Sequence, residues 1–551
     1  MKPMKFKELA VLGGLLAGLL SMNAIPASAQ VEQCTGPQPT SCVPLNGGGS
    51  SAATPFMTQV PLNMLDQAPN LPIHYVNGDI ASPSISAGKL HVWTGTRSGA
   101  PTIFRYSATG SSDGILKLQN PTSNASSLMH YLDHLASTCS SGPNLLTRAS
   151  DGKQYYEYTG CNTIVSGDLP ETMGMADVAG SSFHQVGPFP TSVKPLDQSM
   201  LTSNQASIVP WQFIVGEHVK RNINGVLSPV QSLSRTEIEG IFSRNVTDWS
   251  QVGLATDVTT PGTPDATSPI TLCLRAAGSG SKAALDETVM KDATEFGVQT
   301  VAITSSADGV IFGSSTQDVQ DCMRGNSGNG RPAHPRGIAY VDADVSVATL
   351  PAYPVKLNGM YASDIIVTGL SSSNAPPNPL PNNTPTTLDD TSTTNSSPDG
   401  ITNILQNKFT SGALVNDIVV IISGTGAGQS ATITANTATQ LTVAPAWVTI
   451  PDKTSAYKIV PNLSDSKITV RCGQYLYWAG ERLNVRNYAD AGITAAMTTL
   501  NNDFITNAST SGTIALLPAG QFWVASSDMY VSKNADAGPI IWKAGAHPCA
   551  Q

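Results

Sequence analysis

The sequence predicts a mixed α/β fold that is interrupted by a small all-β module. Strand-like and helix-like segments alternate between residues 209 and 342, which is typical of α/β proteins. Residues 371–400 are rich in Pro, Ser, Asn and Thr and almost lack large apolar side chains, so we expect a linker there. Residues 401–464 contain only strand-like segments, and the α/β pattern returns at Lys467.

The first 29 residues are typical of a cleaved secretory signal peptide. Three lysines precede an apolar run from Leu9 to Leu20, and Ala27-Ser28-Ala29 is a small-residue cleavage site. The apolar run is too short to span a bilayer, and Cys34 follows too late to carry a lipid anchor. We therefore expect a soluble mature chain that starts near Gln30 and is periplasmic or secreted.

The charge of the mature chain argues against nonspecific nucleic-acid binding. The formal net charge is −9, and the first 29 residues carry three lysines and one glutamate, so the mature chain is near −11. Nucleic-acid binding requires a basic surface. An acidic protein can still bind a small anion where local hydrogen-bond donors converge.

Eight cysteines in an exported chain predict disulfide bonds. No C-x-x-C pattern occurs, so the cysteines give no support to a zinc or thioredoxin-like site. Eight cysteines allow many pairings. Pairing in chain order would give Cys34–Cys42, Cys139–Cys161, Cys273–Cys322 and Cys472–Cys549.

In the first part of the mature chain we expect little regular structure before the α/β pattern begins. Residues 30–71 are rich in Gly, Ser and Pro and are predicted to be irregular. Leu90–Trp93 is a strand that leads into the loop Gly95–Gly99. Tyr106–Gly114 is predicted to be a second loop, and Ser126–Leu135 has a helical pattern.

The central part shows clearer helix and strand signals. Val209–Val215 is a strand-like run, and Ser234 with Glu237 forms a capping-box pattern that opens a helix. Ile270–Leu274 is a short apolar strand, and the chain is helical from Ala283.

The predicted β module contains short strands separated by Gly-rich turns. The strands are Asp417–Ile422, Ala431–Thr434 and Leu441–Val443. Gly424–Gly428 could suggest a phosphate cradle, but no Lys-Ser/Thr and no helix follow, so we expect a hairpin turn. The pattern G-x-G-A-G-Q followed by L-T-V-x-P-x-W resembles small β modules of phage-tail and surface proteins.

The segment Arg275–Lys282 has the features of a small oxyanion site. A strand ends at Arg275, a Gly/Ser turn follows, and a helix begins near Ser281. Unpaired N–H groups at a helix N-terminus favour negative charge, and an arginine fork matches a tetrahedral oxyanion. An ordinary strand–turn–helix connection with a solvated arginine would have the same pattern.

The same segment resembles the R-x-D-G-S-G-T motif of the phosphate-binding proteins of bacterial ABC importers, which have the type II periplasmic binding fold. Three further segments match that family in order. Leu233–Phe242 with Val246–Trp249 resembles L-T-x-x-Q-I-x-x-I-F and I-T-x-W, Gly337–Val341 resembles G-x-I-G-Y-V, and Gly473–Trp478 resembles G-x-Y-P-x-W. The matches cover roughly residues 90–360 and 465–535.

The resemblance implies a set of ligand-binding residues. Arg275, Ser279, Gly280 and Ser281 lie on the motif itself, and Ser111 and Asp177 lie on segments that resemble the family's Y-x-x-x-G-S and F-G-x-S-D. Thr96 and Ser98 are candidates from their place in the predicted first loop. In the family the aspartate accepts a proton from a protonated phosphate, which rejects fully ionised anions. Two departures stand out: Ala277 replaces the acid that holds the arginine, and the first-loop wording G-A-G-x-[ST]-F is not recognisable.

The resemblance also implies two lobes with the ligand between them. Lobe one would contain residues 72–208, 343–370 and 465–551, and lobe two residues 209–342, with the linker and β module inserted into lobe one. The implied function is delivery of an oxyanion to an ABC importer, with phosphate as the first expectation and arsenate, sulfate or an organic acid still open. Such a protein needs no cofactor, performs no catalysis and pairs with a permease.

Two other function classes fit parts of the sequence. A secreted structural or surface-interaction protein could reuse this fold, and the added β module favours that alternative. Gly110–Gly114 matches the G-x-S-x-G pattern of serine hydrolases, with Asp177 and His547 as conceivable partners.

His130 and His134 have the i, i+4 spacing of metal ligands on a helix, but no third ligand is evident, so we expect an ordinary surface face.

Overall fold

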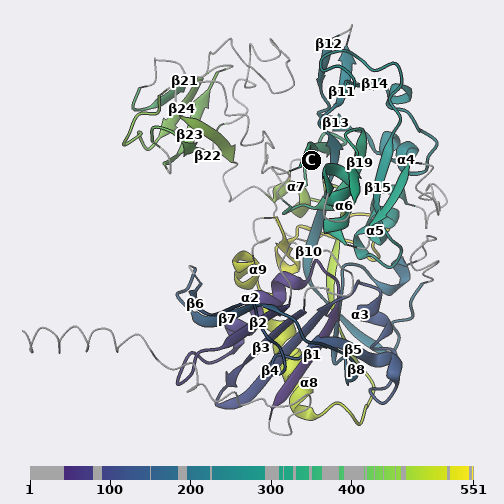
Figure 1. Cartoon of the computed structure of the whole chain (residues 1–551), viewed down its shortest axis with the longest axis vertical. Coiled ribbons are helices and arrows are strands. Elements are labelled where there is room, and N and C mark those ends of the chain that lie inside the picture. The colour runs from purple at the N-terminus through teal and green to yellow at the C-terminus, as the bar shows by residue number, and fades with distance from the viewer. Residues whose placement is uncertain are drawn as a thin grey trace, which may run out of the picture.

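The computed structural model shows a mixed α/β fold that is held together by one large sheet (Figure 1). The residues that it describes are 42–77, 90–148, 150–183, 195–223, 226–291, 309–313, 315–326, 330–345, 350–362, 384–389, 415, 418–426, 429–437, 440–452, 455–460, 467–517, 522–544 and 549. The predicted fold class, an α/β protein with a separate all-β sheet, is confirmed.

Strand β10 (Leu201–Gly216) runs through the middle of the 15-stranded sheet and connects its two halves. Its first part pairs antiparallel with β26 (Trp478–Arg486). Its second part pairs antiparallel with β19 (Gly337–Asp342) and β20 (Ala352–Leu357). The strand predicted at Val209–Val215 is therefore the middle of a longer one, and in Figure 1 it passes from one lobe to the other.

Beyond β26, the sheet continues through the lobe that carries the N-terminal strands. The strands there, in sheet order, are β9 (Met173–Ala176), β1 (Val43–Gly49), β4 (Ala100–Ala108), β3 (Leu90–Arg97), β2 (Ile73–Asn77), β7 (Gln154–Cys161) and β6 (Ser141–Thr147). Helices α2 (Thr54–Met64) and α8 (Ala495–Ala508) pack on each other, and α8 also packs on β1.

The expectation that residues 30–71 are irregular is wrong for the described part. Strand β1 lies buried between β4 and β9 with parallel pairing on both sides, although its sequence is rich in glycine. Helix α2 follows, with a proline in its first turn and Phe56, Met57 and Val60 buried. The pairing partners of β1 lie more than 50 residues away in the sequence, so local composition gave no sign of the strand.

The helix expected at Ser126–Leu135 is also wrong. A short 3₁₀ turn at Ala125–Ser127 leads into strand β5 (Leu128–Leu132), which pairs antiparallel with β8 (Ile164–Pro170). Met129 and Tyr131 are buried while His130 between them is exposed, which is the two-residue period of a strand. His130 therefore does not share a helix face with His134.

The other lobe combines parallel strands with short helices. Strand β15 (Thr271–Arg275) lies between β16 (Val310–Gly313) and β19, parallel to both. Helix α4 (Arg235–Phe242) has the predicted capping box between Ser234 and Glu237 and buries its apolar side chains. Helix α5 (Gly280–Ala284) follows β15, and α6 (Thr316–Arg324) packs on β15, β16 and β19.

The all-β module is a five-stranded antiparallel sheet with its own apolar core, drawn in green apart from the lobes in Figure 1. In sheet order the strands are β21 (Thr387–Asp389), β24 (Gln440–Ala444), β23 (Ser430–Asn436), β22 (Ile418–Ser423) and β25 (Ala456–Val460). Strand β21 falls inside the predicted linker, because its residues complete the sheet beside β24. Gly424 and Gly426 have positive φ in the predicted hairpin turn.

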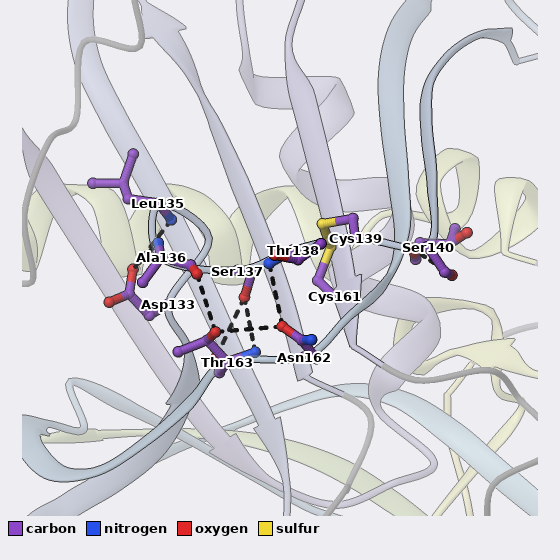
Figure 2. The surroundings of a disulfide bond; sticks show 11 residues. Asp133, Leu135, Ala136, Ser137, Thr138, Cys139, Ser140, Cys161, Asn162 and Thr163 are labelled. Atoms are coloured by element: carbon purple, nitrogen blue, oxygen red, sulfur yellow. Dashed lines mark hydrogen bonds between the residues drawn. A yellow bond between two sulfur atoms is a disulfide. The ribbon is translucent and has the colours of Figure 1, made fainter.

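Three of the four disulfides expected from chain order are confirmed: Cys139–Cys161, Cys273–Cys322 and Cys472–Cys549. Cys42 is also disulfide-bonded, and its expected partner Cys34 lies outside the described residues. Figure 2 shows Cys139–Cys161 joining the loop before β6 to the end of β7, where hydrogen bonds such as Thr163 N to Ser137 Oγ at 3.0 Å add to the connection.

The predicted signal peptide also lies outside the described residues. Within the described ranges, no helix has both the length and the apolar character needed to cross a membrane.

Candidate functional site

Arg275 ends strand β15 with its side chain buried. Its backbone N–H donates to Tyr340 Oη over 3.1 Å, and its Nη1 donates to Thr316 Oγ1 over 3.1 Å. Thr316 in turn donates to Asp342 Oδ2 over 3.3 Å. Asp342 thus supports Arg275 through Thr316, whereas Ala277, at the position of the motif's acid, has no carboxylate that could do so.

The turn after Arg275 leads directly into a helix, as the sequence predicted. Gly278 has φ of 87°, and Ser279 occupies the cap position of α5. The helix continues as a π-helical segment from Leu285 to Met290. Ser279 Oγ and Ser281 Oγ lie 2.9 Å apart and form a pair of hydroxyls in the first turn.

The opposite half of the site comes from the loops that follow β1, β4 and β9. Ser111 Oγ donates to Asp177 Oδ2 over 3.1 Å, and Ser50 Oγ donates to the other carboxylate oxygen, Oδ1. All three side chains are buried. Because β1 lies between β4 and β9 and runs parallel to both, the ends of the three strands meet at one edge of the sheet.

The two halves touch at Gly280. A Cβ atom placed on this residue would lie 2.5 Å from Asp177 Oδ2 and would also collide with Ser111 Oγ. Close by, Ser112 N donates to Gly278 O over 3.2 Å. The structure therefore brings together the segments that carry six of the residues named from sequence, namely Arg275, Ser279, Gly280, Ser281, Ser111 and Asp177.

The structure does not bring Thr96 and Ser98 to this place. They lie at the β3–β4 hairpin, where Ser98 N donates to Asp66 Oδ1 over 3.1 Å. Ser111 follows the other end of β4, so the length of that strand separates it from the hairpin. The segment 96–98 belongs to a hairpin turn, not to the loop between a strand and a helix that the sequence predicted.

Ser50 is the residue that sequence reasoning missed. It follows three glycines at the end of β1 and precedes helix α2, which is the same strand–turn–helix pattern as at Arg275. Gly49 has φ of 123° and leaves no room for a side chain beside Met175. The signal in the sequence was the Gly-Ser run before Thr54-Pro55, which is typical of a turn that leads into a helix.

Two more acids lie close to Asp177. Glu481 of β26 is fully buried, and burial together with the charge of Asp177 raises its pKa well above the usual value. Burial, with Asp344 and Asp177 nearby, raises the pKa of Asp342 to about 7, although Arg275 opposes this. No motif marks either acid in the sequence.

The arrangement also bears on the hydrolase and metal alternatives. Ser112, the serine of the G-x-S-x-G pattern, precedes the short helix α3 (Asp113–Leu116). The carboxylate of Asp177, its conceivable partner, instead accepts hydrogen bonds from Ser111 and Ser50. His547 lies outside the described residues. Within the described part of the chain, no group of three or more His, Cys, Asp or Glu side chains is placed to hold a metal ion.

A comparison with protein families covers the part of the chain that contains Arg275 and α5. Residues 212–467 match a family described as the PBP superfamily domain. None of the curated proteins matches the chain. Among solved structures, the chain is similar to a protein from Clostridium perfringens that was assigned as a phosphate ABC transporter substrate-binding protein and crystallised with bound phosphate. The TM-score is 0.30 and the identity 11%, over 64% of this chain and 79% of that chain.

Proposed function

We propose that this chain, which carries a PBP superfamily domain, is an extracytoplasmic solute-binding protein that holds a small oxyanion between its lobes. Phosphate is the first candidate, and delivery to an ABC importer is the proposed purpose. The observation that supports this best is the contact of Gly280 with Ser111 and Asp177. It joins the arginine-bearing segment of one lobe to a hydroxyl-lined carboxylate of the other.

The segment that carries Gly280 has the chemistry that an oxyanion requires. The Arg275 guanidinium provides charge and a fork of N–H donors, and Ser279 and Ser281 provide hydroxyls. The first turn of α5 adds backbone N–H groups with partial positive charge. A tetrahedral anion would therefore meet donors from several directions.

Asp177 favours an anion that still carries a proton. Its carboxylate oxygens accept hydrogen bonds from the hydroxyls of Ser50 and Ser111. An ionised carboxylate repels a fully ionised anion such as sulfate but accepts a hydrogen bond from monohydrogen phosphate or arsenate. We therefore expect phosphate and arsenate to bind better than sulfate.

Binding of this kind involves no covalent chemistry. The backbone of Gly280 lies directly against the side chains of Ser111 and Asp177, so an entering anion would have to part the two lobes. The crossing strands β10 and β26 are the connections about which the lobes would open. Release to a permease would follow the reverse movement.

Isothermal titration with phosphate, arsenate and sulfate tests the proposal. Wild type should bind phosphate, and Arg275→Ala should lose at least about 100-fold in affinity, because a charge-assisted contact contributes about 1.5–3 kcal/mol and the guanidinium makes more than one. Arg97→Ala, at the hairpin near Thr96 and Ser98, is the matched control and should bind like wild type. Absence of heat with all three anions would rule the proposal out.

A surface-interaction role is the second candidate, and one observation favours it. In the β module, Val448 is 95% exposed and Ile450 is 41% exposed, although the module has a complete core of its own. Exposed apolar side chains of this kind are suited to a protein contact. In that case a Val448→Asp and Ile450→Asp double variant would be lost from the cell envelope while its phosphate titration stayed unchanged. Equal retention of variant and wild type would argue against this role.

A further inference from the structure

Glu481 lies directly behind the carboxylate of Asp177. In the antiparallel pair of β26 and β9, Arg482 is opposite Ala176 and Leu483 is opposite Met175. One residue further along the same antiparallel register, Glu481 comes beside Asp177, with which its carboxyl group interacts. On its other side, Glu481 pairs with Ser207 of β10, so it sits in the middle of the sheet and is fully buried.

The surroundings of Glu481 oppose its ionisation. The groups that face it are Asp177, Asp342 of β19, the Tyr106 hydroxyl of β4 and its neighbour Arg482. Arg482 also contacts Asp536 at 3.4 Å, so its charge is shared. Neither carboxyl oxygen of Glu481 accepts a hydrogen bond from the described residues. A buried carboxylate without donors is unfavourable, so the neutral acid is the stable form.

A neutral acid at this place completes the hydrogen bonds of Asp177. An ionised carboxylate offers about four acceptor positions. Ser50 and Ser111 each use one, and the O–H of protonated Glu481 would use a third. One position would then remain for the proton of an incoming anion.

We propose that Glu481 is a proton-carrying positioning residue of the oxyanion site. Its acid O–H donates to the carboxylate of Asp177 and leaves that carboxylate one acceptor position for a protonated anion. The inference rests on the proposed function. When Glu481 loses its proton, two buried carboxylates face each other and the anion is repelled.

The consequence is a loss of affinity at alkaline pH that depends on Glu481. In Glu481→Gln the amide N–H replaces the acid O–H and donates to Asp177 at every pH. The ionisation of free phosphate affects both proteins equally, so it cancels in the comparison. The proton on Glu481, and its effect on Asp177 and Asp342 beside it, distinguishes the two pH profiles.

Phosphate titration calorimetry from neutral to alkaline pH measures this difference. At neutral pH the two affinities should agree within about threefold, because one neutral donor replaces another. At alkaline pH wild type should become at least about tenfold weaker than Glu481→Gln, as expected for a carboxylate that gains a like-charged neighbour. Glu239→Gln, which removes an acid from α4, should follow the wild-type profile. Parallel profiles for wild type and Glu481→Gln would overturn the inference.

A second measurement needs no ligand. Infrared difference spectra of wild type against Glu481→Gln should show the C=O stretch of a protonated carboxylic acid at neutral pH. If phosphate binds but this band is absent, the inference alone fails. If the band is present but no anion binds at any pH, the proposed function fails, while the protonated state of Glu481 is established.

Wild type alone provides a test if Glu481→Gln does not fold. In the pH range where its affinity falls, phosphate binding should take up about one proton from the buffer, seen as a dependence of the heat on buffer ionisation. Heats that are independent of the buffer in that range would overturn the inference.

Discussion

Arg275 and Thr316 are in hydrogen-bond contact, with Arg275 Nη1 donating to Thr316 Oγ1 over 3.1 Å. Thr316 is the first residue of α6, and its hydroxyl reaches Asp342 Oδ2 on β19. The arginine is thus braced by two elements that are distant from it in sequence. This brace takes the place of the acid that the family resemblance led us to expect at position 277.

Removal of the threonine hydroxyl should weaken anion binding without unfolding the protein. In Thr316→Val, Arg275 loses an orienting contact, and a lost hydrogen bond of about 1 kcal/mol corresponds to about fivefold in affinity. Phosphate titration measures the effect. Thr469→Val removes another side-chain hydrogen bond, to Tyr361 O at 3.1 Å, and should leave the affinity unchanged. Equal affinities for Thr316→Val and wild type would show that the brace is not needed.

The contact between the lobes should be sensitive to a single methyl group. Gly280→Ala would place a Cβ atom 2.5 Å from Asp177 Oδ2, so the lobes could not meet as they do here. We expect loss of phosphate binding and a larger radius of gyration in small-angle scattering. Gly512→Ala, in the first turn of α9 (Ser511–Leu516), meets open space and is the matched control. An unchanged radius and affinity for Gly280→Ala would contradict the arrangement.

The Cys273–Cys322 disulfide should matter for the site as well as for stability. It ties β15, which carries Arg275, to α6, which carries Thr316. Its closure of a 49-residue separation is worth roughly 4 kcal/mol in the chain-entropy model, so the double serine variant should unfold at lower urea concentration and bind phosphate more weakly.

The matched control for that experiment is the double serine variant of Cys139–Cys161, which closes a 22-residue separation in the other lobe. Its stability loss should be roughly 3 kcal/mol, and its phosphate affinity should not change. If both variants bound phosphate equally well, the disulfide would have no part in holding the site.

The pH dependence of stability should contain a contribution from Glu171. Burial raises the pKa of this carboxyl to about 7, despite the Lys117 Nζ at 3.0 Å. The folded state then holds a proton that the unfolded state releases near its ordinary pKa of about 4.5. The stabilisation is complete below that value and is lost as the pH rises through 7.

Urea unfolding of wild type and Glu171→Gln at several pH values isolates this contribution. Between about pH 4.5 and 7, wild type should lose about 3 kcal/mol more than the variant, which has no proton to release. A stability difference between the two proteins that did not change with pH would show that Glu171 ionises normally in the folded protein.

The local signals in the sequence were sufficient where a structure depends on near neighbours. The capping box of Ser234 and Glu237, and the strand–turn–helix around Arg275, both appear as expected. Caps and turns are set by hydrogen bonds over a few residues, so their patterns can be read directly. Short strand-like segments separated by Gly-rich turns likewise predicted the β module, and chain order predicted three disulfides.

Tertiary structure decided which of these segments meet. A glycine-rich stretch became strand β1 because β4 and β9 pair with its backbone on both sides, which placed Ser50 against Asp177. Sheet register set Glu481 beside the same carboxylate. Such contacts join residues separated by long stretches of chain, and backbone pairing leaves no local pattern to read. The sequence by itself therefore determined the arginine-bearing half of the candidate site and, through the family resemblance, named Ser111 and Asp177, whereas folding alone added Ser50 and Glu481 around that carboxylate.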